Sequence, residues 1–525
     1  MSVDQVKLRV HTSFWWKTAV FAGLFALVFI LQLLSGAYRS EFGGYPDEPA
    51  HYVTSVMVRD YLLHGKIAEP MEFAKEYYKS YPKVAFGHWP PLLYAVQGIW
   101  MLVFSESRAS VLLELALTTT LAGFLLFLVA ARHFGRIAGI CAAALLLCLP
   151  VIQTYADEEM AESLLLVTGF CAAIFFYRYL EDKNWRDSFW FGIFCSLAIL
   201  TKGNGWALAM IPPIAIVLTW DYAMLKRPSF WIPVPLVAIF CVPWQLLTLE
   251  MADRGWVGGS KPNIGYTLDA VGEFGFVLLA LVGWALAFLA CVGLWFCVLR
   301  PFLSKKVQPL YAVMAALIAA IWVFHSVVPA GVEARKMINA LPAVILFAMA
   351  GGFWAASLIP TRFISRRYAP TAVAAIAAVL FASQTFAIPR EQHYGFEEAS
   401  QYIANRADLK HAVILVSSES DGEGMFISEL MMRDQRPGHT ILRASKVLSH
   451  SDWNGNVSEE FCQNPGDVIA IVKRENVRAV VVDRFPPHVN FRHNGFVLQA
   501  IHDNPQAWRL AASFSAGKVQ IYESR

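Results

Sequence analysis

The sequence is poor in charged residues, and its cysteines form no disulfide framework. Charged residues make up 16% of the 525 residues, whereas about 25% is usual in soluble globular domains. Seven of the eight cysteines lie inside apolar runs, where cysteine behaves as a small hydrophobic residue, and only Cys462 lies in a polar region. That region therefore has no internal disulfide, and the composition argues against a soluble enzyme.

Apolar residues take the place of the missing charge. They make up 57% of the chain and include 37 Phe and 17 Trp. An apolar helix of about twenty residues crosses the ~30 Å hydrocarbon core of a bilayer. We expect a polytopic α-helical membrane protein with eleven spans, at residues 18–38, 110–131, 137–154, 161–180, 188–201, 205–225, 229–249, 272–299, 309–328, 339–359 and 369–388.

The distribution of Lys and Arg between these runs predicts the orientation. Lys7, Arg9 and Lys17 precede the first run, which ends without a small-residue cleavage site, so we expect a retained helix with a cytoplasmic N-terminus. With alternating sides, the cytoplasmic segments carry 16 Lys and Arg residues and the four short outside loops carry 5. This asymmetry favours a cell (inner) membrane protein whose chain lies outside after the eleventh span.

Residues 39–109 form one long first outside loop in this topology. The run Pro90–Phe104 is apolar for only about fifteen residues, below the ~17–25 that a spanning helix needs. We therefore place it at the membrane surface. A second interfacial helix is predicted by apolar residues at helical spacing, namely Val53, Val56, Met57 and Tyr61.

From about Pro389 to Arg525 the composition is ordinary, and the apolar pattern predicts a small extracytoplasmic α/β domain. The expected helices are 396–406, 424–434 and 465–476, and the expected strands are 411–417, 440–444, 479–483, 508–514 and 518–523, the last two as a hairpin. The segment has no Gly-rich phosphate loop, no metal-spaced Cys or His cluster and no G-x-S-x-G motif. We thus divide the chain into a transmembrane domain, 1–388, and a tail domain, 389–525, with an accessory or acceptor-guiding role for the tail.

The densest polar cluster beside the membrane is 43–52, which contains the adjacent acids Asp47 and Glu48. One interpretation is structural: Asp47 caps the following helix, with Pro49 in its first turn. The other is functional, because a helix N-terminus stabilises an ionised carboxylate that can accept a proton or hold a cation. The two interpretations are compatible.

A second acidic segment, 155–162, opens the fourth span. Since an acid facing lipid is costly, we expect Glu162 to face the protein interior, whereas Asp157 to Glu159 suit a solvated loop. Basic residues are scarce on the outside face, and a lipid phosphate needs such cations. The candidates are Lys202, Arg335 and Lys336, for which interfacial snorkelling is the alternative. His88 is either a structural residue or a metal or phosphate ligand.

Residues 18–345 resemble the GT-C glycosyltransferases that use lipid-linked sugars, a superfamily that includes the protein O-mannosyltransferases and the aminoarabinose transferases of lipid A. The resemblance depends on five features in order: Asp47-Glu48-Pro49, the segment His88 to Tyr94 with its Pro-Pro-Leu, Met160-Ala161-Glu162, the turn Leu200 to Gly203, and the basic loop from Arg335 to Pro342. The sequence departs from many relatives at Trp89, where they have Lys, and at Glu162, where they have Asp.

The resemblance implies an inverting glycosyltransferase that moves a sugar from a polyprenyl or dolichyl phosphate to an acceptor hydroxyl. Asp47 would take the hydroxyl proton, with Glu48 and Glu162 as further catalytic candidates. We expect the substrate-binding residues to be Lys202, Arg335, Lys336, Tyr45, His51 and Trp89. A divalent metal ion at His88 and Glu48 is left open. The acceptor is a protein, a lipid or a glycan; membrane lipids are partners and nucleic acid is not.

A transporter or lipid flippase is the main alternative, because it would also need many spans and outside cations. Such proteins usually have repeated halves and broken helices near the midplane, but this sequence has no convincing internal repeat and its acids gather at one face. A non-enzymatic scaffold leaves the acidic loop unexplained. The sequence therefore favours the enzyme.

Overall fold

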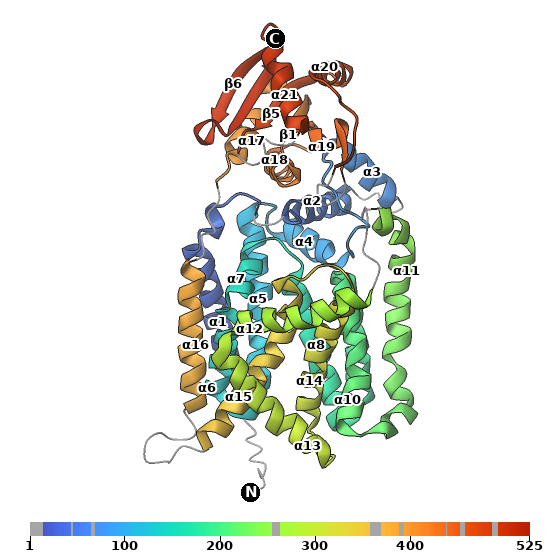
Figure 1. The fold of residues 1–525 in the computed structure, drawn as a ribbon, viewed down its shortest axis with the longest axis vertical. Coiled ribbons are helices and arrows are strands. Elements are labelled where there is room, and N and C mark those ends of the chain that lie inside the picture. Colours follow the sequence, from blue (N-terminus) through green and yellow to red (C-terminus); the bar gives the residue numbers. More distant parts are fainter. Residues whose placement is uncertain are drawn as a thin grey trace.

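The computed structural model describes residues 14–43, 46–64, 69–254, 263–357, 369–387, 393–436, 438–451, 457–485 and 492–525. A bundle of long helices occupies one end of the molecule, and a domain that contains the strands of the chain's only described sheets caps the other end (Figure 1). Short helices from the first outside loop lie between them (Figure 1). The protein is an integral membrane protein with a C-terminal strand-containing domain.

The bundle is built from helices of very different length. Its long helices are α1 (Phe14–Leu34), α5 (Arg108–Phe134), α8 (Glu162–Asp182), α11 (Pro233–Arg254), α12 (Ile264–Leu294), α14 (Pro309–Val327) and α16 (Ala369–Ala387). Shorter helices complete it, namely α6 (Arg136–Leu147), α7 (Pro150–Asp157), α9 (Trp185–Thr201), α10 (Ile211–Thr219), α13 (Arg300–Leu303) and α15 (Leu341–Ser357).

Three of the eleven predicted runs contain a break in the regular α-helix. The run 137–154 is split into α6 and α7, which meet at a bend of 61°. The run 205–225 begins as a 3₁₀ helix, Gly203–Met210, and reaches α-helix only in α10. The run 272–299 is broken within α12, where Gly283 has a φ of 74°, a conformation that glycine adopts without steric cost.

Length and composition identify seven candidate spans among the described residues, or eight if the bent pair is one span. The seven lie in α1, α5, α8, α11, α12, α14 and α15, the last together with the 3₁₀ helix Ala334–Ala340 before it. The other predicted runs correspond to shorter segments, namely α9, the segment Gly203–Thr219 that contains α10, and the apolar part Thr371–Gln384 of α16. An apolar run indicates that a segment is buried in lipid or protein, but the hydrophobicity of the run does not show where the helix is broken within it.

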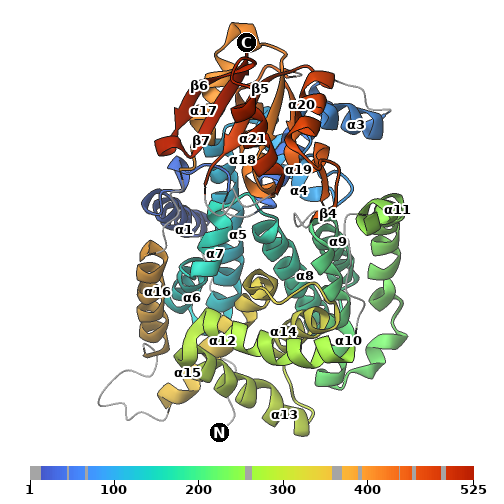
Figure 2. The same cartoon turned by 45° about the horizontal axis from the view of Figure 1, so that its top comes forward.

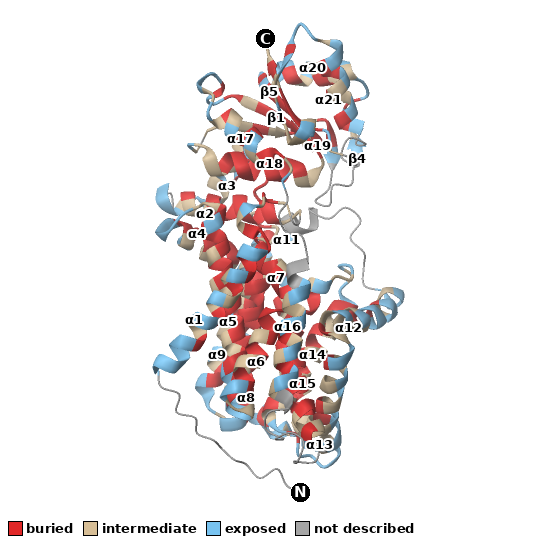
Figure 3. Ribbon diagram, turned by 90° about the vertical axis from the view of Figure 1, so that its left-hand side faces the viewer, coloured by how far each residue is buried: buried red, intermediate tan, exposed pale blue. Residues whose placement is uncertain are grey.

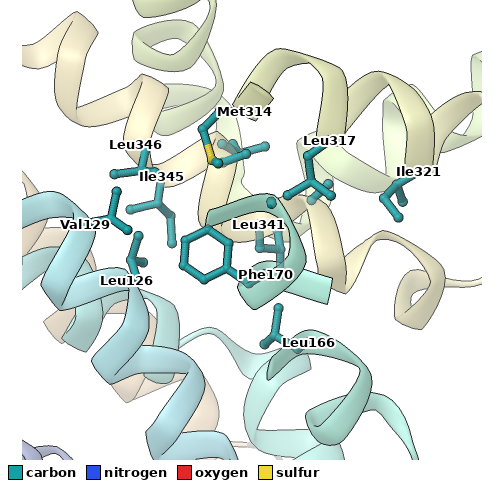
Figure 4. Close-up of a cluster of buried hydrophobic side chains, with 14 of the residues drawn as sticks. Leu126, Val129, Leu166, Phe170, Met314, Leu317, Ile321, Leu341, Ile345 and Leu346 are labelled. Atoms are coloured by element: carbon teal, nitrogen blue, oxygen red, sulfur yellow. The ribbon is translucent and has the colours of Figure 1, made fainter. Parts of the chain in front are cut away.

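The bundle core is formed by apolar side chains of most of its helices. Phe170 of α8 lies at its centre, among residues of α5, α14 and α15 that include Leu126, Met314 and Ile345 (Figure 4). Burial follows this arrangement, with buried residues along the helix faces that meet in the bundle interior (Figure 3). Outward faces carry exposed large apolar residues such as Phe240 and Trp284, as expected of a surface in contact with lipid.

The first outside loop contains three helices: α2 (Glu48–His64), α3 (Pro70–Ser80) and α4 (Leu92–Val103). The two interfacial helices expected from the sequence correspond to α2 and α4, which lie crosswise between the bundle and the tail domain (Figure 1). The sequence analysis missed α3. Its apolar face is narrow, and Ala74 is its only buried residue among those described.

The tail domain has a five-stranded mixed sheet in the order β2-β1-β5-β7-β6. Strands β1 (Val413–Ser417), β2 (Thr440–Arg443) and β5 (Val477–Asp483) are parallel, and β6 (Trp508–Phe514) and β7 (Val519–Ser524) form an antiparallel hairpin. All five predicted strands and the three predicted helices are thus confirmed; those helices are α17 (Phe396–Ala404), α18 (Ser420–Arg433) and α20 (Pro465–Arg474). The analysis missed α19 (Ala444–Val447), α21 (Arg492–Asp503) and the small sheet of β3 (Ser449–Ser451) and β4 (Val457–Glu460).

The two faces of the five-stranded sheet have different partners. Strand β1 alternates between them, since Ile414 and Val416 pack with α17 and α18 whereas Leu415 packs with α20 and α21. The face with α17 and α18 is turned toward the bundle (Figures 1 and 2). Helix α18 therefore lies directly over the first outside loop.

Candidate active site

Asp47 lies immediately before the first residue of α2, at the end of the bundle that faces the tail domain. Its carboxylate Oδ2 accepts a hydrogen bond of 3.1 Å from the guanidinium Nη1 of Arg335. The two side chains are 14% and 13% exposed, so this ion pair is largely withdrawn from water but still reachable. The N-terminal position on a helix adds a favourable field for the carboxylate.

Three further charged residues extend this pair into a cluster. Lys202 Nζ lies 2.5 Å from Glu162 Oε1, and Arg335 Nε lies 3.9 Å from the same oxygen. Glu333 Oε2 accepts from Arg335 Nε at 2.7 Å. The segments before α2, α10 and α15 and the first residue of α8 therefore meet at one point, although 288 residues separate Asp47 from Arg335.

Lys336 closes the cluster on one side. Its ammonium lies 3.4 Å from Glu333 Oε1 and donates to the backbone oxygens of Ala330 and, at 2.6 Å, Gly331. The three cations expected from the sequence thus lie together with the three acids Asp47, Glu162 and Glu333. One oxygen of Glu162, Oε2, is buried without a partner among the described residues, so the cluster has unused capacity for a hydrogen-bond donor.

The local backbone explains how the cations reach this point. Lys202 lies between the end of α9 and the 3₁₀ helix Gly203–Met210, and Arg335 lies in the 3₁₀ helix Ala334–Ala340 that leads into α15. A Cβ added at Gly205 would collide with the backbone of Ala198. Glycine is therefore required where the chain folds back on α9, which accounts for the second glycine of the Gly-Asn-Gly that follows Lys202.

Glu48 has a different environment from its neighbour. Its side chain is 1% exposed, and its oxygens accept from the backbone N–H groups of Gly43 at 3.0 Å and Glu159 at 3.2 Å. Arg108 of α5 lies 3.4 Å away. These contacts join α2 to α5 and to the loop before α8, so they describe a buried structural anchor.

The expected solvated loop of acids is wrong for two of its three members. Asp157 and Glu159 are buried, and Asp157 accepts from Ser35 at 2.9 Å. Burial raises the pKa of Glu159 well above its ordinary value, and the nearby carboxylates Glu48 and Glu114 raise it further. The expectation for Glu162 is confirmed, because it is buried and faces the cluster.

Aromatic rings stand beside the charged cluster. The ring of His51 lies 4.5 Å from that of Trp89, and His51 Nδ1 lies 3.1 Å from the Tyr94 hydroxyl. Burial lowers the pKa of His51 from 6.5 to about 4, so the imidazole is neutral at pH 7. Burial also lowers the pKa of His88, against the opposing effect of Asp47. Tyr45, also expected at the site, lies outside the described residues.

The described residues offer little to a metal ion. They contain no group of three or more His, Cys, Asp or Glu side chains placed to hold one. Both Glu48 oxygens already accept backbone N–H groups. His88 and Glu48 therefore do not fit a metal centre in this arrangement, and no chemical step is derived through a metal.

Two residues of this region escaped the sequence analysis. Glu333 lies two residues before Arg335 and accepts a hydrogen bond from it. An acid so close to Arg335 in the basic loop was the feature of the sequence that could have indicated this contact. Lys83 is buried between the first outside loop and α18, where its Nζ donates to the Ser420 carbonyl at 3.1 Å. Burial lowers the pKa of Lys83 to about 7. No local pattern marks a lysine as buried by a domain more than 300 residues away.

Part of the chain matches known proteins in sequence. Residues 88–246 match the family model for dolichyl-phosphate-mannose-protein mannosyltransferase. A curated relative, the undecaprenyl phosphate-alpha-4-amino-4-deoxy-L-arabinose arabinosyl transferase of Shewanella sediminis, is 28% identical over 178 residues. That match covers 32% of this chain and 31% of the relative, so it spans about a third of each.

Solved structures match nearly the whole chain. ArnT from Cupriavidus metallidurans, bound to undecaprenyl phosphate, has a TM-score of 0.63 at 15% identity and covers 96% of this chain and 98% of its own. The archaeal oligosaccharyltransferase AglB from Archaeoglobus fulgidus, in complex with an inhibitory peptide and a dolichol-phosphate, has a TM-score of 0.55 at 14% identity, over 97% of this chain and 75% of its own. At these identities the likeness establishes the fold.

The chain shares the fold of ArnT and AglB. Its similar proteins in sequence and in structure are glycosyltransferases named for lipid-linked sugars or bound to lipid phosphates. The likeness in sequence extends over about a third of the chain.

Proposed function

We propose that this protein is an inverting glycosyltransferase that moves a sugar from a polyprenyl phosphate to an acceptor hydroxyl. The observation that carries the proposal is the Asp47–Arg335–Glu162–Lys202 cluster, in which the partly exposed carboxylate of Asp47 pairs with Arg335 and Glu162 links Arg335 to Lys202. The names of its relatives, an arabinosyl transferase using undecaprenyl phosphate and a dolichyl-phosphate-mannose mannosyltransferase, support a donor of this class.

In the proposed reaction the acceptor oxygen attacks the anomeric carbon and its proton passes to Asp47. The bond between that carbon and the phosphate oxygen breaks, and polyprenyl phosphate leaves. The donor phosphodiester carries one negative charge and the departing monoester gains a second. Lys202, Arg335 and Lys336 supply the cations that offset this growing charge, and such fixed charges stabilise a transition state because they need little reorganisation.

The acids balance the positive charge of the cluster. Asp47, Glu162 and Glu333 supply three carboxylates to the three cations Lys202, Arg335 and Lys336. A bound donor phosphate would share these cations with the acids. When the lipid phosphate departs, the acids again balance the cations, so no buried charge is left unpaired. Trp89 and His51, which lie beside the cluster, would contact the sugar through their ring faces.

We place the reaction on the outer face of the cell membrane, with the N-terminus in the cytoplasm. The excess of Lys and Arg in the segments at the opposite end from the cluster supports this orientation. Water and acceptor reach the cluster from the side of the tail domain, since the membrane-crossing helices surround the remainder of the bundle. The acceptor is an exposed hydroxyl of a protein, lipid or glycan on that side.

The test uses the purified full-length protein in lipid vesicles. Two donor probes are compared, undecaprenyl phosphate carrying radiolabelled 4-amino-4-deoxy-L-arabinose and dolichyl phosphate carrying radiolabelled mannose, with membranes of a strain lacking the gene as the source of acceptor. We expect one donor to release its lipid phosphate and to label an acceptor. Movement of intact donor between leaflets without release would refute transfer and indicate a flippase.

A further inference from the structure

The turn that carries Asp47 lies against helix α18 of the tail domain. On one side, a Cβ added at Gly43 would collide with the Met425 side chain of α18. On the other side, a Cβ added at Gly424 of α18 would lie 3.0 Å from Pro49 Cβ. The Ser428 hydroxyl donates to the Pro49 carbonyl at 3.3 Å. Helix α18 thus contacts the chain four residues before Asp47, at Gly43, and two residues after it, at Pro49.

These contacts belong to a continuous core. Phe42, Tyr52 and Val56 of the first outside loop share one buried apolar cluster with Phe426 and Ile414 of the tail domain. No layer of water or lipid separates the two parts at these residues. The tail domain and the loop that carries Asp47 are therefore packed as one unit, whereas Arg335 belongs to the bundle.

Polar contacts fix the same unit at its edges. Glu41 accepts three backbone N–H groups where α17 begins, from Tyr394 at 2.9 Å, Gly395 at 3.1 Å and Glu397 at 2.9 Å. At the far end of α2, Arg436 of the tail donates to Asp60 and to Glu106, each at 2.7 Å. Helix α2 is thus held by the tail domain along its whole length.

We propose that α18 is a positioning element of the transfer site, which holds Asp47 at the correct place relative to Arg335. This inference rests on the proposed function, in which Asp47 accepts the acceptor proton. Its structural basis is that Asp47 is fixed from above by α18 and from below by the bundle. The tail domain is in this view part of the site, and it acts through Asp47 without touching the donor.

Gly424 is the residue at which the inference can be tested. A Cβ added at Gly424 would lie 3.0 Å from Lys83 Cε and 3.0 Å from Pro49 Cβ. The ring of Pro49 is rigid. A larger side chain must push α18 and the Asp47 turn apart. Displacement of a catalytic group by about 1 Å can cost a factor of about 100 in rate. Alanine and leucine both favour helix over glycine, so neither substitution weakens α18 itself.

Gly495 provides a matched control. It lies in α21 on the opposite face of the sheet, and no described atom lies within 4 Å of a Cβ added there. Gly495→Ala and Gly495→Leu carry the same chemical changes in a helix of the same domain. The four variants are compared with wild type for release of undecaprenyl phosphate or dolichyl phosphate from the two donor probes, and for binding of undecaprenyl phosphate alone.

We expect Gly424→Leu to lower turnover at saturating donor by about tenfold to a hundredfold, with unchanged binding of undecaprenyl phosphate. Gly424→Ala should show a smaller loss in the same direction, and it carries the test if the leucine variant fails to fold. Both Gly495 variants should turn over like wild type. A raised KM for the acceptor with unchanged turnover would overturn the inference, because it would assign α18 to acceptor binding.

Two further outcomes separate the inference from the proposed function. Full turnover by both Gly424 variants, beside an active wild type and an inactive Asp47→Asn protein, overturns the positioning role alone. No release of lipid phosphate by wild type from either donor overturns the proposed function and this inference with it.

Discussion

Replacing Asp47 by Asn tests whether this carboxylate accepts a proton or only orders its surroundings. Asn caps a helix about as well as Asp, has the same size and keeps an oxygen that can accept from Arg335 Nη1, now 3.1 Å away. It cannot take a proton at neutral pH. The substitution therefore removes the proposed chemistry and leaves the geometry of the turn.

The structure indicates how large the two effects should be. Arg335 keeps Glu333 at 2.7 Å and Glu162 at 3.9 Å after the substitution, so its charge is not left unpaired. The Asp47–Arg335 pair is largely buried, but Asn still accepts from Arg335, so we expect the loss of stability to stay near the net contribution of one hydrogen bond, about 1 kcal/mol. Loss of a general base costs about a hundredfold in rate, or about 2.7 kcal/mol of transition-state stabilisation. The rate effect should clearly exceed the stability effect.

The assay measures release of lipid phosphate at saturating donor, together with the apparent Tm in detergent. Asp187→Asn is the control, because Asp187 forms an ion pair with Arg178, also at 3.1 Å, at the opposite end of α8. It should retain full turnover. A rate within a few-fold of wild type for Asp47→Asn would refute the role of Asp47 as base and leave Glu162 as the next candidate.

The remaining predictions concern donor binding, topology and pH. Lys202→Gln and Arg335→Gln should each weaken binding of undecaprenyl phosphate without reducing the amount of protein in the membrane, whereas Lys75→Gln, at an exposed side chain, should not. A reporter that is active only outside the cytoplasm should be active when fused after Arg525, and a reporter that is active only in the cytoplasm should not. Burial raises the pKa of Glu41 from 4.5 to about 7. Between these two pH values, Glu41 keeps its proton while the tail domain is packed against the first outside loop and releases it when the two parts separate. Protection of the tail domain from protease should therefore fall as pH rises from about 5 to about 7, and Glu41→Gln should remove this dependence.

The sequence alone was sufficient for the class of protein and for the elements of the tail domain. Long apolar runs can be buried only in lipid or in a large core, so they identify a membrane protein without any contact information. The strands of the tail alternate or are continuously apolar, and each was found within a few residues. The order of the motifs also indicated the segments that meet at the cluster. Loops between successive spans alternate between the two sides of the membrane, so the motif-bearing loops are expected on one side.

The tertiary structure decided which member of each acidic group belongs to the cluster. Asp47 and Glu48 are adjacent and chemically equivalent, yet Asp47 meets Arg335 while Glu48 is buried against Arg108. Successive residues of a helix point about 100° apart, so neighbours face different partners. Glu159 lies in the loop between α7 and α8 whereas Glu162 is the first residue of α8, and no property of the local sequence distinguishes them.

The role of the tail domain likewise depended on packing between distant segments. Gly424 is an ordinary helix residue in the sequence, and only its contact with Pro49 gives it significance. Patterns of three or four residues report the backbone and the burial of one face, because these follow from local sterics and from apolar spacing. The pairing of charges across hundreds of residues follows from how the segments pack, and that was settled only when the chain had folded.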